Sequence, residues 1–178
     1  KTKYKIEDSM LVKSNGQVMA VAFQQNAQNL FYRKDIFDKL GLTVPTTYDE
    51  MLQAAAVIKA KDPSIDFPIA QTFSKGFDIS VEFVNIYVGF GGKMFKPGTA
   101  QPAFNGEAGL KTIELMKQMS KFMTPNYLAS NSDDVMNQFQ QGKAAMGVLW
   151  ASRAARMDDP AASKIAGKME FAAAPAAV

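Results

Sequence analysis

The sequence predicts a layered α/β fold, because short apolar runs alternate with segments of helical periodicity along the whole chain. Hydrophobic residues make up 47% of the 178 residues and charged residues 21%, close to the averages for globular proteins. The run from Ala144 to Leu149 is apolar throughout, which is typical of a strand covered on both faces. We therefore expect one α/β domain with a mixed sheet flanked by helices.

Two apolar runs near the start predict strands. Asn15-Gly16 is a turn signal, and the run from Val18 to Ala22 that follows it is predicted to be a buried strand. Leu30 to Tyr32 form a second extended run. The residues from Asp35 to Leu40 predict a short helix that ends at Gly41.

A capping motif predicts where the next helix begins. Thr47 and Glu50 have the Ser/Thr-x-x-Glu spacing of a capping box. Asp62-Pro63 ends the pattern. Between these points, apolar residues recur at helical spacing: Met51, Leu52, Ala55 and Ile58.

The second half of the chain continues the alternation. Phe67 to Ala70 and Met169 to Ala173 predict strands, the second of them buried, and Phe77 to Val88 predicts a helix. Asn105 and Ser132 are predicted to cap two further helices. The core-facing residues of the helix after Asn105 are expected to include Leu110, Ile113 and Met116. Those of the helix after Ser132 are Val135, Met136 and Phe139.

The composition excludes most catalytic chemistry. Cysteine and histidine are both absent, which removes thiol nucleophiles, imidazole bases, disulfides and the commonest zinc ligands. No spacing singles out a catalytic Asp, Glu, Lys or Tyr. We therefore expect a protein that is not an enzyme and that has no metal and no cofactor.

Charge and hydropathy also limit the partners. The net charge is +3, and the Lys and Arg residues are scattered among 17 acids, so nucleic acid is not indicated. No apolar run is long enough to span a bilayer, so contact with a membrane is expected to be peripheral at most. Because the chain opens at Lys1 without Met and ends on an apolar stretch, we expect a fragment.

Five short motifs follow one another in a fixed order: NGQVMAVA at 15–22, LFYRKDIF at 30–37, GL with PTTYDEM at 41–51, GG with FN at 91–105, and FQQGKAAM at 139–146. Together they resemble the family of bacterial extracellular solute-binding proteins that includes the maltodextrin-binding protein. Tyr32-Arg33 stands where that family has Tyr-Asn.

The resemblance implies a periplasmic-binding-protein-like lobe, one of two lobes that close on a ligand in the cleft between them. Residues 1–178 are then a single partial domain, with 1–16 near the crossing between lobes. The implied protein is the substrate-binding component of an ABC importer for a sugar or polyol. Its partners are the permease subunits, and its location is periplasmic or otherwise extracytoplasmic, as a membrane-anchored lipoprotein in a Gram-positive cell. The alternatives are an interaction module or a binder of another small polar or anionic metabolite.

A sugar site needs an aromatic plane for the apolar C–H face and polar side chains for the hydroxyls. Trp150, the one tryptophan, stands at the end of a predicted strand, where it stacks on a sugar or fills the core. Ser152 and Arg153 open a short predicted helix, where they bind hydroxyls or an anionic group, or else only cap the helix and face solvent.

Further candidates come from the segment before Leu30. Gln25 and Asn26 lie there, either as a polar loop or as ligand-binding amides, and Asn26 aligns with a family carboxylate that binds sugar hydroxyls. The resemblance also places Phe77 and Asp78 in a second cleft loop. We expect one cluster at the edge of the sheet, made of Asn26, Trp150, Ser152 and Arg153.

Overall fold

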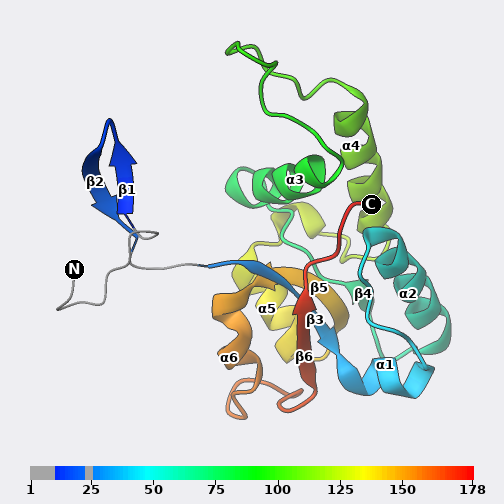
Figure 1. Cartoon of the computed structure of the whole chain (residues 1–178). Helices are drawn as coiled ribbons and strands as arrows, with labels where there is room; N and C mark the ends of the chain where they lie inside the picture. Colours follow the sequence, from blue (N-terminus) through cyan, green and yellow to red (C-terminus); the bar gives the residue numbers. More distant parts are fainter. Residues whose placement is uncertain (1–10, 23–25) are drawn as a thin grey trace.

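Four strands form the central sheet, in the order β4-β5-β3-β6 (Figure 1). The structure, a computed structural model, describes residues 11–22 and 26–178. The strands are β3 (Gln28–Arg33), β4 (Phe67–Ile69), β5 (Ala144–Trp150) and β6 (Met169–Ala173). β3 runs antiparallel to β5 and to β6, whereas β4 runs parallel to β5, so the predicted mixed α/β sheet is confirmed.

Helices follow the strands in the predicted order. They are α1 (Lys34–Leu40), α2 (Tyr48–Lys61), α3 (Phe77–Gly89), α4 (Glu107–Ser120), α5 (Ser132–Gln140) and α6 (Ala154–Met157), with short 3-10 turns η3 (Tyr127–Ala129) and η4 (Ala151–Arg153). The capping box of α2 is present: Glu50 N donates to Thr47 Oγ1 at 3.2 Å, and Thr47 N donates to Glu50 Oε2 at 3.2 Å. Gly41 ends α1 with the positive φ of 64° that such a cap requires.

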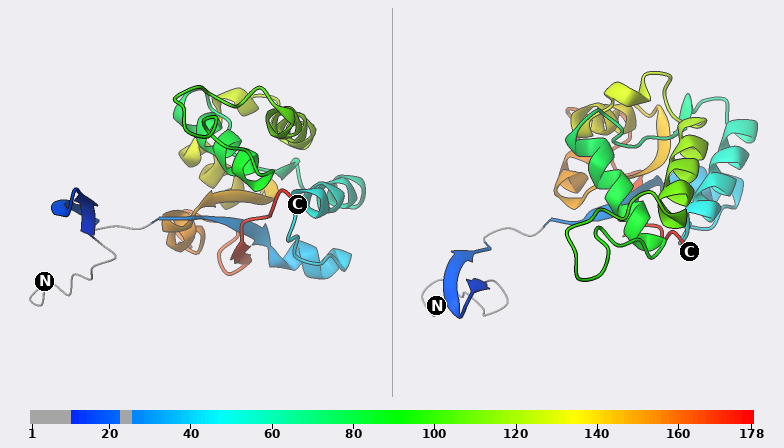
Figure 2. Two further views of the ribbon diagram at one scale, coloured as in Figure 1. Left: turned by 45° about the horizontal axis from the view of Figure 1, so that its top comes forward. Right: turned by 90° about the horizontal axis from the view of Figure 1, so that it is seen from above.

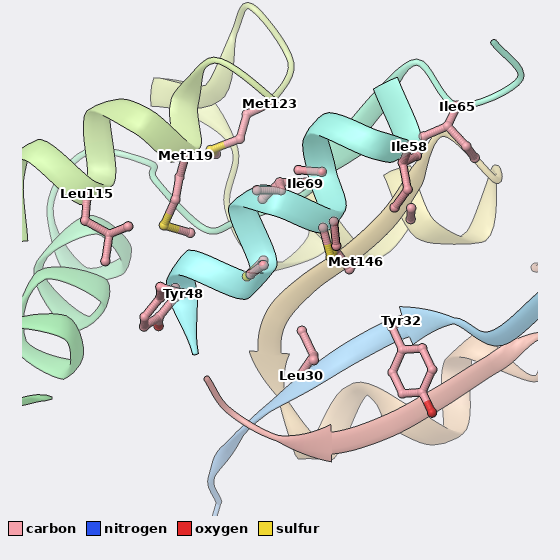
Figure 3. Packing of buried hydrophobic residues seen from close by; sticks show 14 of the residues in the cluster. Leu30, Tyr32, Tyr48, Ile58, Ile65, Ile69, Leu115, Met119, Met123 and Met146 are labelled. Atoms are coloured by element: carbon pink, nitrogen blue, oxygen red, sulfur yellow. The ribbon is translucent and has the colours of Figure 1, made fainter. Parts of the chain in front are cut away.

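Successive residues of β3 point to opposite faces of the sheet and enter different hydrophobic clusters. Leu30 and Tyr32 belong to the cluster that includes side chains of α2, α4 and β5, of which Figure 3 labels Ile58, Met119 and Met146. Phe31 packs on the other face with residues of α5 and α6: Val135, Met136, Phe139 and Met157. Both faces are therefore covered, and the prediction that Ala144 to Leu149 are buried is confirmed.

Two predicted caps are wrong. α4 begins after Gly106 and has no side-chain cap, so Asn105 does not cap it. Leu110 and Ile113 are 72% and 49% exposed. The residues of α4 that are buried include Leu115, Met116 and Met119, and the helix contacts α2 and α3. α5 is capped by Asn131, not Ser132, because Oδ1 of the Asn131 side chain accepts from the backbone N–H groups of residues 133 and 134.

The strand predicted at Val18 to Ala22 forms, but its predicted burial is wrong. β1 (Leu11–Ser14) and β2 (Gln17–Val21) make a separate antiparallel hairpin, and every residue of β2 is exposed. Asn15 and Gly16 form its turn, both with positive φ. The hairpin lies apart from the main sheet in Figures 1 and 2. An apolar run indicates that a strand can be buried, but two strands alone cannot cover each other.

β6 also shows that an apolar run predicts a strand but not its burial. Met169 to Ala173 form a strand, yet only Met169 is buried, so the prediction of a buried strand there is wrong. β6 lies at the edge of the sheet, where it pairs with β3 alone. Phe171 still contributes to packing, because its ring meets Phe31 edge-on at 4.8 Å.

Gly147 lies where β5 passes closest to the segment after β4. A Cβ atom there would lie 1.8 Å from the Ala70 carbonyl oxygen, so we expect Gly147→Ala to lower the free energy of unfolding by about 3 kcal/mol. Urea unfolding followed by circular dichroism would measure the loss. Gly106→Ala is the control, since a Cβ atom there meets only Ala103 O at 4.0 Å, and it should cost under about 1 kcal/mol. Equal losses would contradict the prediction.

Candidate functional site

A pocket of about 470 Å³ lies where β3 begins and β5 ends. The antiparallel register sets Gln28 opposite Trp150, so the ends of two neighbouring strands form one wall. α3 supplies another wall through Val81, Val84, Asn85 and Val88, and Tyr48 and Pro175 complete the lining. The pocket therefore combines an aromatic side chain, apolar walls and several amides.

Asn26 and Ser152 meet beside this pocket although they are 126 residues apart in sequence. Asn26 Nδ2 donates to Ser152 Oγ at 3.1 Å, and the Ser152 backbone N–H donates to Asn26 Oδ1 at 3.2 Å. Asn26 and Trp150 both line the pocket, and Trp150 is only partly buried. The structure thus brings three of the predicted residues together, whereas their role in binding stays a prediction.

Three other candidate residues lie outside the pocket. Arg153 does not line the pocket, and its guanidinium pairs with Asp133 Oδ1 at 2.5 Å. Phe77 is 72% exposed at the start of α3, and Asp78 accepts a hydrogen bond from Ser74 Oγ at 2.5 Å. Neither Phe77 nor Asp78 lines the pocket. Gln25 lies outside the described residues.

Directly beneath the pocket is a carboxyl group that sequence reasoning missed. Glu82 of α3 is 0% exposed. Its Oε1 accepts from Thr72 Oγ1 at 2.7 Å and from Gln28 Nε2 at 2.8 Å, and its Oε2 accepts from Gln71 Nε2 at 2.5 Å. A signal was present, since Glu82 is the one charged residue in the apolar stretch from Ile79 to Val84.

Burial raises the pKa of Glu82 to about 7, although hydrogen bonds from Thr72, Gln71 and Gln28 lower it in part. The charge of Asp78 also raises it. Tyr48 lines the same pocket, and burial, with a smaller effect of the Glu82 carboxylate, raises the pKa of its hydroxyl above the ordinary value. The Tyr48 hydroxyl therefore stays protonated at neutral pH.

A chain of amides connects Glu82 with the pocket wall. Gln28 donates to Glu82 through Nε2, and its Oε1 accepts from Asn85 Nδ2. Both Gln28 and Asn85 line the pocket. On the inner side, Gln71 Oε1 accepts from the backbone N–H of Val148 at 3.0 Å. The buried carboxyl group is thus tied both to the sheet and to the pocket.

A second hollow, also of about 470 Å³, lies between α3 and α4 and differs in chemistry. Its lining is almost entirely apolar and includes Ile79, Phe83, Phe104, Ile113 and Met116. It offers one side-chain hydroxyl, that of Ser80, and no amide. The pocket at the end of β5 is the better site for a polar solute.

The profile of one protein family covers nearly the whole chain. That of the bacterial extracellular solute-binding proteins matches residues 4–177. The chain belongs to this family. A similar curated protein is the mannitol-binding protein of Pseudomonas aeruginosa, which is 24% identical over 96% of this chain and 39% of its own length.

Solved structures of solute-binding proteins share the fold. A solute-binding protein of an ABC transporter from Agrobacterium radiobacter, in complex with ribitol, has a TM-score of 0.82 and 27% identity over 98% of this chain and 44% of its own. One from Agrobacterium vitis with bound D-mannitol has a TM-score of 0.81 and 25% identity over 96% and 43%. The chain therefore spans less than half the length of these relatives.

In the described part of the chain, no helix is long and apolar enough to cross a membrane. No group of three or more acidic side chains in that part is placed to hold a metal ion.

The raised pKa of Glu82 predicts how stability depends on pH. Between the ordinary value of 4.5 and about 7, the folded protein holds a proton that the unfolded chain has released. This contribution is present below pH 4.5 and is lost as the pH rises through 7. We expect the free energy of unfolding to fall by about 2 kcal/mol more in the native protein than in Glu82→Gln between pH 5 and pH 8.

Urea unfolding of both proteins at each pH would measure this difference. Carboxyl groups such as Asp35 and Glu50, whose pKa values are lowered, change their charge at lower pH and do so in both proteins. Parallel pH profiles of the two proteins would show that Glu82 does not bind a proton in this range.

Proposed function

We propose that this chain forms most of one lobe of a two-lobe solute-binding protein, which delivers a sugar or polyol to an ABC importer. One observation carries the proposal: Trp150 lies beside the amides of Asn26, Gln28 and Asn85 in a pocket at the end of β5. The indole suits the apolar face of a carbon chain or ring. Each amide offers both a donor and an acceptor to hydroxyl groups.

The lining favours a neutral ligand over an anionic one. Among the described residues, no Lys or Arg side chain lines the pocket, and Arg153 is paired with Asp133. An anion in this pocket would lose its hydration without gaining a cationic partner, which is costly. A neutral polyol loses less, because its hydroxyls exchange water for amides.

The relatives support a polyol as the first choice of ligand. The structures with ribitol and D-mannitol are at least 25% identical to this chain, and the curated mannitol-binding protein is 24% identical. Maltose-bound T. maritima MalE3 has a TM-score of 0.83 but 20% identity, so it supports the fold alone.

The remaining parts of the proposal follow from the family. A second lobe would supply the opposite wall of the cleft and close over the ligand. The protein would act outside the cytoplasm, in the periplasm or as a lipoprotein on a Gram-positive cell, and would dock on the permease subunits. Catalysis is not proposed, because the carboxyl group nearest the pocket, Glu82, is buried and already accepts three hydrogen bonds.

Trp150→Ala tests the pocket directly. In the full-length protein we expect this change to weaken the binding of ribitol or D-mannitol at least about tenfold, because it removes the stacking surface. Titration calorimetry would measure the dissociation constant. Phe77→Ala is the matched control, since Phe77 is exposed and lies outside the pocket, and it should leave the constant unchanged. Loss of binding only in the Phe77 variant would place the ligand elsewhere.

A phosphorylated polyol tests the choice of a neutral ligand. Because no described cationic side chain lines the pocket, we expect mannitol 1-phosphate to bind at least about tenfold more weakly than D-mannitol. Competition against bound D-mannitol, followed by titration calorimetry, would measure the ratio. Tighter binding of the phosphate would favour the alternative of an anionic metabolite.

A further inference from the structure

A carboxylate only accepts hydrogen bonds, so it dictates how the amides around it are turned. Glu82 faces two such amides, Gln71 and Gln28, and one hydroxyl, Thr72. Each amide that turns its nitrogen to Glu82 must turn its oxygen the other way. The carboxylate therefore fixes the direction of both side chains.

The inner amide offers an independent check of this direction. A backbone N–H can only donate, so Gln71 must present Oε1 to Val148 N. Gln71 then presents Nε2 to Glu82, and Glu82 Oε2 must be an acceptor. The sheet thus fixes one oxygen of the carboxyl group, and only Oε1, which faces Thr72 and Gln28, can change its role.

The orientation of the Glu82 carboxylate also determines how the amides of Gln28 and Asn85 are turned at the pocket. Gln28 donates to Glu82 and therefore accepts from Asn85 Nδ2 through its own oxygen. Asn85 is exposed, lines the pocket and has its amide nitrogen turned to Gln28. Its Oδ1 accepts no hydrogen bond from a described residue, so it is available to a ligand hydroxyl.

We propose that Glu82 is a positioning residue that fixes the direction of Gln28 and Asn85, so that Asn85 presents a hydrogen-bond acceptor to a hydroxyl group of the ligand. The inference rests on the proposed function, because it deepens the role of the same pocket. Glu82 itself does not touch the ligand. It acts through Gln28, which links α3 to the start of β3.

Glu82→Gln reverses the direction of the hydrogen bonds that run from position 82 through Gln28 to Asn85. With its oxygen kept toward Gln71, the new side chain presents an NH2 group toward Gln28, and an NH2 group cannot accept. Gln28 and Asn85 must then turn, and Asn85 presents a donor in place of an acceptor. In the full-length protein we expect this variant to bind D-mannitol at least about tenfold more weakly by titration calorimetry.

Gln28→Glu in the same variant restores the original direction. The carboxylate at position 28 accepts from the NH2 group at position 82 on one side and from Asn85 Nδ2 on the other. Asn85 again presents its oxygen, so the double variant Glu82→Gln with Gln28→Glu should recover most of the lost affinity. A residue that only supported the fold would not be rescued by a second change in the pocket wall, and loss of binding in both variants would overturn the inference.

The pH dependence of binding by the native protein gives a second test. The ionised form of Glu82 holds Asn85 in the binding direction. Burial raises the pKa of Glu82 to about 7. The other ionisable groups acting on Glu82 are Asp78 on α3 and Tyr48 on α2, and the segments of Gln28, Thr72 and Val148 add none. D-Mannitol affinity should therefore rise a few-fold from pH 6 to pH 8, and less in Glu82→Gln.

A fall in affinity over this range would overturn the inference, because it would mean that the ligand prefers the protonated carboxyl group. Binding of D-mannitol by the native protein and equally by Glu82→Gln would overturn this inference alone. A native protein that bound no sugar or polyol would overturn the proposed function, and the inference with it.

Discussion

The antiparallel pairing of β3 with β5 decides where the site lies. It places Gln28 opposite Trp150 and Leu30 opposite Val148. Inside the sheet, both faces of β5 are covered by helices, so its side chains serve the core. Only the last residue of the strand, Trp150, is partly open, and Asn26, which precedes β3, lines the same pocket. Polar side chains thus gather at the end of a sheet whose faces are covered, as is usual for α/β binding sites.

The same pairing makes a buried carboxyl group tolerable. An uncompensated charge in the interior is expensive, and no described cation pairs with Glu82. Three donors offset part of that cost, and they come from two parts of the fold: Gln28 from β3, and Gln71 and Thr72 from the segment after β4. Gln71 is held in turn by the backbone of β5. The polar network therefore depends on the strand order β4-β5-β3, which brings its members together.

Local signals in the sequence were enough for most elements of the fold and for little of the site. α2 could be predicted because its capping box and apolar spacing lie within the helix itself. The exposure of β2 and of most of β6 could not be predicted, because burial depends on what lies beside a strand. Asn26 and Trp150 were found through the resemblance to a family, which supplies long-range information. Glu82 was missed because its donors lie outside its own helix, and no spacing in the sequence connects Gln28, Gln71 and Thr72 with it.

The placing of charge also explains how such a pocket can suit a neutral ligand. A carboxylate at the pocket surface would bind hydroxyls strongly, but it would have to give up its own hydration whenever a ligand covered it. In this fold the carboxyl group lies one side chain deeper and has already been removed from water. Gln28 donates to the carboxyl group and Asn85 donates to Gln28, so the oxygen of each amide faces away from Glu82. The pocket wall thus presents an acceptor but no charge. In the proposed complex, a ligand hydroxyl would meet an oriented amide oxygen, whose desolvation costs far less than that of an ion.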